Sequence, residues 1–162
     1  HCITAYLGNL RGIPTIDKAI ADEEIFGIVS AAMKESGAGL IKKYGFDPEK
    51  HAAYIKKIIG RFKNPYLQDD VTRVGREPLR KLSPTDRLIK PMMTAAGYGL
   101  PVDHLVIGAG AALHYDNPND KQSVELQEKI GAQGVRAAAA EITGLTDEGL
   151  LDAIVAEYEK LN

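Results

Sequence analysis

Residues 64–91 of the chain read NPYLQDDVTRVGREPLRKLSPTDRLIKP, and the rest of the sequence is best understood from this stretch. The stretch contains several prolines. Because proline fixes the backbone and lacks an amide donor, a single helix cannot simply run through residues 64–91. Its cations therefore sit on short, stiff pieces of chain, as in many sites that hold a phosphate or a carboxylate. A solvated charged face is the alternative interpretation. The cations are Arg73, Arg76, Arg80, Lys81, Arg87 and Lys90.

The charge of the chain is unevenly distributed. The formal net charge is -2. Residues 42–90 nevertheless hold thirteen Lys and Arg against six Asp and Glu, so the remainder carries a charge of minus nine. A net acidic chain is a poor binder of nucleic acid or of an anionic membrane surface. A local basic region favours a small anionic ligand.

Length and composition indicate one soluble domain. A chain of 162 residues with 44% hydrophobic residues is long enough to bury a sizeable core, so we expect residues 1–162 to form a single domain. The lone Cys2 excludes an internal disulfide and suits a reducing compartment. With no signal peptide and no apolar run of about 18 residues, the expected location is cytoplasmic. Because the sequence begins without Met, we expect it to be part of a longer protein.

The pattern on either side of the basic stretch is helical. Apolar or small residues recur on one face between residues 22 and 44, with Gly45 as the C-cap. Acceptor-then-proline signals predict helix starts at Asp47-Pro48 and at Ser83-Pro84, the latter helix bending near Pro91. Residues 1–7 are left undecided. We predict an all-α fold of about eight helices, the later ones near residues 102–115, 120–130, 133–142 and 147–161.

Two familiar kinds of site do not fit. The run Gly108-Ala109-Gly110 lacks the third glycine of a dinucleotide fingerprint and follows no strand, so close helix packing is the better interpretation. No pair of histidines has the i, i+4 spacing of a helical metal site, and one cysteine cannot form a thiolate cluster. We therefore expect no metal. The histidines are His1, His51, His104 and His114.

Several long runs resemble a known family. The chain is similar to the polyol-specific long-chain dehydrogenases, and among them to mannitol-1-phosphate 5-dehydrogenases. The similarity covers the whole chain and weakens after about Leu113. The matching runs are HCITAYLG (1–8), KYGFD (43–47), HAAYI (51–55), GRFKNPYL (60–67), RVGREPLRKL (73–82) and DRLIKP (86–91).

This resemblance implies the helical, substrate-binding C-terminal domain of an NAD-dependent enzyme. The NAD-binding Rossmann domain would precede it and is absent from this chain. Members carry a Lys-x-x-x-x-Asn-x-x-His motif whose lysine is the general base, whose asparagine stabilises the alkoxide and whose histidine binds a substrate hydroxyl. Only that histidine, His1, lies in this sequence, so it is the one implied catalytic residue. The implied reaction interconverts D-mannitol 1-phosphate and D-fructose 6-phosphate without a metal.

The resemblance also suggests a purpose for the basic stretch, namely to hold the phosphate of the sugar and so position the carbinol. By family position Arg76 comes first, with Arg80 or Lys81, and Arg73 is a weaker candidate. Arg73 and Arg87 could equally be structural. In that case they would pair with Asp69, Asp70 or Asp86.

Two other interpretations remain open. A sibling enzyme could act on an unphosphorylated polyol or a hexuronate, since arginine also binds carboxylates. A helical binding module without catalysis is the third possibility, and the start inside a catalytic motif argues against it. The expected partners are a small sugar or polyol phosphate and the preceding Rossmann domain, with no nucleic acid and no membrane.

Overall fold

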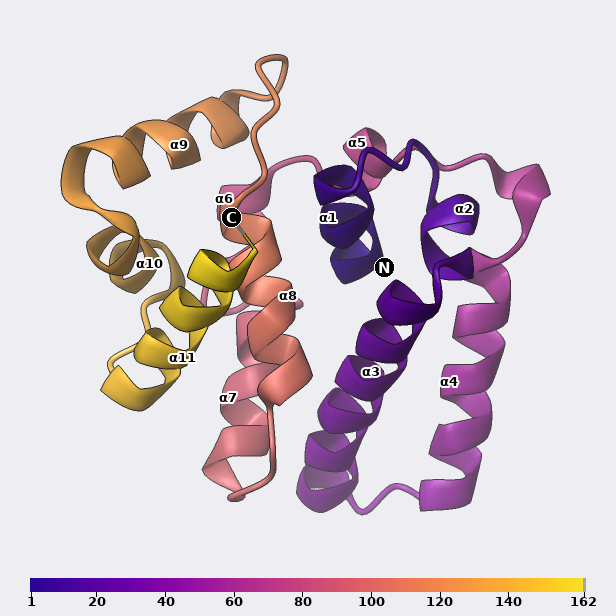
Figure 1. Ribbon diagram of the computed structural model, residues 1–162. Coiled ribbons are helices and arrows are strands. Elements are labelled where there is room, and N and C mark those ends of the chain that lie inside the picture. The colour runs from indigo at the N-terminus through magenta and orange to yellow at the C-terminus, as the bar shows by residue number, and fades with distance from the viewer. Residues whose placement is uncertain (162) are drawn as a thin grey trace.

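The computed structural model describes residues 1–161, and in them every regular element is a helix. Eight of the eleven α-helices have nine residues or more, which confirms the predicted all-α class (Figure 1). The helices are α1 (Cys2–Leu10), α2 (Ile16–Ala21), α3 (Glu23–Tyr44), α4 (Pro48–Phe62), α5 (Val71–Val74), α6 (Pro78–Lys81), α7 (Ile89–Gly97), α8 (Asp103–Leu113), α9 (Lys121–Gln133), α10 (Val135–Thr143) and α11 (Glu148–Lys160), with a 3-10 turn at Pro65–Leu67.

Local capping signals place most helix ends where the sequence predicts them. The Asp22 carboxylate accepts from the amides of Glu24 and Ile25 at the start of α3. At its end Gly45 takes a left-handed conformation (φ 70°) that costs glycine little. Asp47 caps α4 with a proline in the first turn, as predicted. The long antiparallel pair of α3 and α4 follows from these signals (Figure 1).

Helix α8 is the centre of the fold and packs against α1, α3, α7 and α11. It is buried nearly all round, as its apolar sequence predicts. Gly108 and Gly110 make this packing possible: a Cβ at Gly108 would lie 2.7 Å from the Ile3 side chain, and one at Gly110 would lie 3.0 Å from the backbone nitrogen of Tyr158. The prediction of close helix packing at these glycines is confirmed. None of the helices in residues 1–161 is long and apolar enough to cross a membrane.

Of residues 1–7, undecided from the sequence, all but His1 belong to a buried helix. Every residue from Cys2 to Gly8 in α1 is buried. A segment that is apolar on all sides shows neither the helical nor the strand period, and its length alone does not distinguish the two. Contacts with α2, α3, α5 and α8 surround α1.

The prediction of a helix start at Ser83-Pro84 is wrong. Helix α7 begins at Ile89, and residues 82–88 form a series of turns. Leu82 and Leu88 are both buried, so the chain is anchored in the core at each end of an exposed turn. Pro91 then falls in the first turn of α7, where a missing amide donor costs nothing, and the reason for a bend disappears.

Candidate functional site

His1 stands at the start of α1 and borders two cavities. Its ring stacks on Phe62 with centroids 4.8 Å apart and an interplanar angle of 11°. Its Nε2 lies 3.8 Å from Oδ2 of Asp69, and 42% of the side chain is exposed. One face of the imidazole is thus fixed by an aromatic ring, while a polar edge remains open to a ligand.

Asp69 is held beside His1 by the backbone. Thr15 and Asp70 form an isolated antiparallel bridge, in which the Ile16 amide donates to the Asp69 carbonyl at 2.9 Å. The Asp69 carboxylate pairs with the guanidinium of Arg73, four residues later. Asp69 therefore links the histidine to the basic stretch, and Arg73 has the structural pairing that its sequence position allowed.

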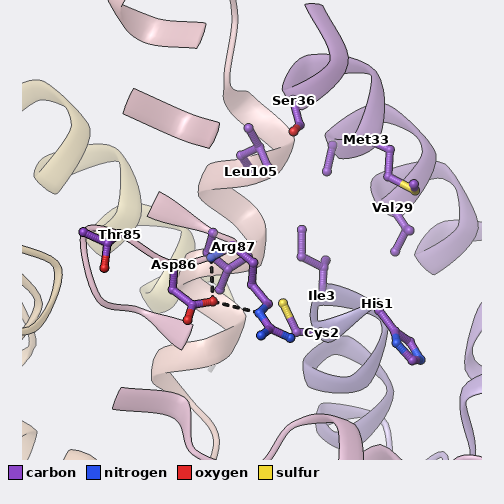
Figure 2. A pocket seen from close by; sticks show the side chains of 12 residues that line it. His1, Cys2, Ile3, Val29, Met33, Ser36, Thr85, Asp86, Arg87 and Leu105 are labelled. Carbon is purple, nitrogen blue, oxygen red and sulfur yellow. Dashed lines mark hydrogen bonds and ion pairs between the residues drawn. The ribbon is translucent and has the colours of Figure 1, made fainter. Parts of the chain in front are cut away.

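The first cavity has a volume of about 560 Å³ and lies between α1, α3, α8 and the turn before α7 (Figure 2). Most of its wall is apolar. Its charged side chains are Asp86 and Arg87, and its lining also includes the imidazole of His1. Figure 2 shows the Arg87 guanidinium between Asp86 and Cys2. The full lining is His1, Cys2, Ile3, Val29, Ala32, Met33, Ser36, Thr85, Asp86, Arg87, Leu88 and Leu105.

The second cavity lies on the other side of His1 and has a volume of about 420 Å³. Its charged groups are the carboxylates of Asp17 and Asp69 and the guanidinium of Arg61. Because Asp69 already pairs with Arg73, the charges of Asp17 and Arg61 balance, and the cavity has no surplus positive charge for an anion. This space suits a neutral, hydroxylated group better than a phosphate.

The basic segment, residues 71–81, is held in place by buried side chains that bind its backbone. The Tyr6 hydroxyl donates to the Gly75 carbonyl at 3.0 Å, and the Tyr115 hydroxyl donates to the Thr72 carbonyl at 3.2 Å. From α9 and its N-cap, Asp120 and Gln122 accept from the amides of Glu77 and Arg80. The backbone is thus fixed by tyrosines of α1 and of the turn after α8.

The four cations predicted to bind phosphate have different environments. Arg73 pairs with Asp69, and Arg80 pairs with Glu77 at 2.9 Å. Lys81 is 2% exposed, and its ammonium donates to the carbonyls of Val74 and Arg76. Arg76 reaches only the Arg73 carbonyl at 3.3 Å, with no carboxylate at ion-pair distance among residues 1–161. Arg73 and Arg76 line a third cavity of about 740 Å³, whose lining does not include His1.

Positive charge gathers behind the first cavity. Arg80 and Arg87 each pair with a carboxylate, whereas Arg76 and Lys81 have none at ion-pair distance among residues 1–161. Burial lowers the pKa of Lys81 to about 8, and repulsion from Arg87, Arg80 and Arg76 acts in the same direction, although Cys2 opposes it. Burial acts to raise the pKa of Asp86, but the hydrogen bonds from Arg87 and the charges of Arg87 and Arg80 hold it below its usual value. These effects show that the four cations lie close enough to interact, which favours an anion nearby.

A histidine between two cavities, with cations on one side, is the candidate site of this helical domain. The chain belongs to the family of mannitol dehydrogenase C-terminal domains, whose family model matches residues 1–162. It is therefore a domain of the polyol dehydrogenase type, in an oxidoreductase context.

Sequence reasoning did not find two features of this site. Arg87 was one of six cations in the basic stretch, and its pairing with Asp86 was an equal alternative. The matching runs DRLIKP (86–91) and GRFKNPYL (60–67) contain Arg87 and Phe62. Neither run indicates that these side chains lie beside His1, because the contacts cross sixty residues of chain or more. Among residues 1–161, no three His, Cys, Asp or Glu side chains are grouped for a metal ion.

Proposed function

We propose that this chain is the substrate-binding domain of an NAD-dependent oxidoreductase that interconverts D-mannitol 1-phosphate and D-fructose 6-phosphate. The observation that carries the proposal is the first cavity, which places His1 and Arg87 in one wall in front of clustered cations. The polyol dehydrogenase family and the similarity to mannitol-1-phosphate 5-dehydrogenases support the same reaction.

The residues of this chain would bind and orient the sugar. His1 would hydrogen-bond a hydroxyl of the substrate, with Phe62 and Asp69 holding the imidazole in place. A bound NAD would supply the hydride acceptor for oxidation of the secondary alcohol, and a base outside this chain would take the hydroxyl proton. The run Gly108-Ala109-Gly110 lies inside α8, where the two glycines face Ile3 and α11 in close helix packing. The cofactor would therefore belong to a preceding Rossmann domain.

A phosphorylated substrate fits the charge of the first cavity better than a neutral polyol. The lining of the first cavity contains one carboxylate, that of Asp86, and it is already paired with Arg87. Arg76, Arg80 and Lys81 add positive charge behind the wall. Binding energy from the phosphate, which does not react, can then be used to align the carbinol beside His1.

Calorimetric titration tests this proposal. The chain and the full-length protein are titrated with mannitol 1-phosphate, fructose 6-phosphate, free mannitol and inorganic phosphate at two salt concentrations. The full-length protein is given the cofactor form that leaves each ligand unreacted, NAD with fructose 6-phosphate and NADH with the other ligands. We expect the phosphorylated sugars to bind, the affinity to fall at higher salt, and free mannitol to bind at least tenfold more weakly. Equal affinity of the full-length protein for mannitol and mannitol 1-phosphate would contradict the proposal.

A further inference from the structure

We propose that Arg87 binds the anionic group of the substrate directly in the first cavity, and that Asp86 is a positioning residue for it. The identity of the substrate rests on the proposed function. The assignment of the contact to Arg87 rests on geometry. It differs from the sequence prediction, which gave first place to Arg76.

The Arg87 guanidinium is oriented with its two outer nitrogens unused. Oδ1 of Asp86 accepts from the Arg87 amide at 2.6 Å and from Nε at 2.7 Å. Neither Nη group has an acceptor among residues 1–161. A guanidinium held at Nε still presents its two Nη groups as a fork, which matches two oxygens of a phosphate or carboxylate.

The turn that carries Arg87 is anchored on both sides. Leu82 is fully buried and Leu88 is 1% exposed, whereas 55% of the Arg87 side chain is exposed. Two core residues thus fix an exposed cation at a defined place in the cavity wall (Figure 2). Pre-positioning of this kind reduces the entropy lost when a ligand is bound.

The location of Arg87 separates it from the other cations. It lines the same cavity as His1, whereas Arg76 lines the third cavity, which shares no lining residue with the first. Arg61 shares the second cavity with His1 but faces it together with Asp17 and Asp69. A ligand in the cavity of His1 that carries one anionic end therefore meets Arg87. Arg80 and Lys81 add to the field without reaching the ligand.

The first test measures fructose 6-phosphate and fructose affinities of the full-length protein in the presence of NAD, which cannot reduce either sugar. We expect Arg87→Ala to lower the fructose 6-phosphate affinity roughly tenfold to a hundredfold, as loss of a charge-assisted contact does. Fructose affinity should change less than about twofold. Arg87→Lys should recover part of the loss, since it keeps the charge without the fork. Matched variants are Arg76→Ala and Arg61→Ala, which should each stay within about threefold of the wild type.

The second test concerns Asp86. Asp86→Asn keeps the shape of the side chain but weakens its hold on Arg87, so fructose 6-phosphate affinity should fall by a smaller factor than in Arg87→Ala. Because Asp86 acts through Arg87, the double variant should bind no more weakly than Arg87→Ala alone. Additive losses would show that Asp86 does not position the arginine. Thermal unfolding checks that each variant folds, and Arg87→Gln replaces any alanine variant that does not.

The outcomes separate this inference from the proposed function. Fructose 6-phosphate binding that depends on Arg76 but not on Arg87 would overturn the inference and leave the function standing. If a hexuronate binds in an Arg87-dependent way and fructose 6-phosphate does not bind, the inference is kept and the proposed substrate is overturned. If neither anion binds the full-length protein with NAD, both the inference and the proposed function are overturned.

Discussion

Lys81 illustrates how one side chain can lie in a basic run and still be unavailable to a ligand. The sequence places it among the phosphate-binding candidates, next to Arg80. In the structure its ammonium is buried and donates to two backbone carbonyls of the basic segment, at Val74 and Arg76. Its direct effect is therefore on the shape of that segment. Its charge acts on the first cavity only at a distance.

The burial of Lys81 predicts a pH-dependent stability. Its folded pKa is about 8, against 10.5 in the unfolded chain. Between those values the unfolded chain binds a proton that the folded chain has released, so stability rises with pH, by at most about 1.4 kcal/mol per unit. From pH 7.5 to 9.5 we expect a gain of about 1–2 kcal/mol in the free energy of unfolding relative to Lys81→Met, measured by urea denaturation.

The unfolding measurements on the wild type and Lys81→Met stay below pH 10 because of Tyr6. Burial raises the pKa of Tyr6, so stability is lost once tyrosine begins to ionise in the unfolded chain. The difference between the wild type and Lys81→Met isolates the lysine, since both proteins keep Tyr6. Parallel pH profiles would show that the two carbonyl bonds offset the burial of the ammonium.

At the scale of elements, α8 depends on contacts with helices that are remote in sequence. Glu35 of α3 caps its start: the two carboxylate oxygens accept from the amides of His104 and Leu105 at 2.9 Å and bond to His104 Nδ1 at 2.8 Å. At the other end, α11 approaches closely enough that only glycine fits at position 110. Both ends of the central helix are thus fixed by tertiary structure.

The close approach at Gly110 predicts opposite effects for two glycine-to-alanine changes. Gly110→Ala would bring a Cβ to 3.0 Å from the Tyr158 nitrogen, so we expect a loss of about 1–3 kcal/mol in the free energy of unfolding. Gly131→Ala in α9 is the matched control, because nothing lies within 4 Å and alanine is the better helix former. It should gain about 0.5–1 kcal/mol. Equal effects in thermal or urea unfolding would show that α8 and α11 can move apart.

At the scale of the whole molecule, the helices are grouped around α8, and the candidate site lies at the start of α1. The α3–α4 pair, α1 with the basic segment, and the α9–α11 group surround α8 (Figure 1). The charged walls of the cavities meet at His1, at the start of α1. Under the proposed function, the base and the cofactor reach this site from another domain.

This arrangement predicts that the pure 162-residue chain has no dehydrogenase activity. Incubation with NAD and mannitol 1-phosphate, followed at the absorbance of NADH, should give no turnover above the blank. The full-length protein under the same conditions is the positive control. NAD-dependent turnover by the chain alone would overturn the assignment of the base and cofactor to another domain.

The sequence alone was sufficient to predict most of the helices and to recognise the family. Caps such as Asp22, Asp47 and Gly45 act within one turn of the chain, so their effect can be read locally. The failure at Ser83-Pro84 has a long-range cause: Leu82 and Leu88 are buried against the core, and that contact outweighs a cap-and-proline signal. Helix α1 stayed undecided because burial on all sides removes the periodicity.

The candidate site was decided by tertiary structure. Composition showed that residues 73–90 are cationic, but not which cations are already paired. Asp69 neutralises Arg73 because the backbone bridge between Thr15 and Asp70 holds Asp69 in place. The Lys81 ammonium is already hydrogen-bonded to carbonyls of its own segment. His1 and Arg87 meet in one cavity although 85 residues separate them. Local preferences determined the helices; the distribution of charge around the ligand depended on packing between distant segments, which no local pattern encodes.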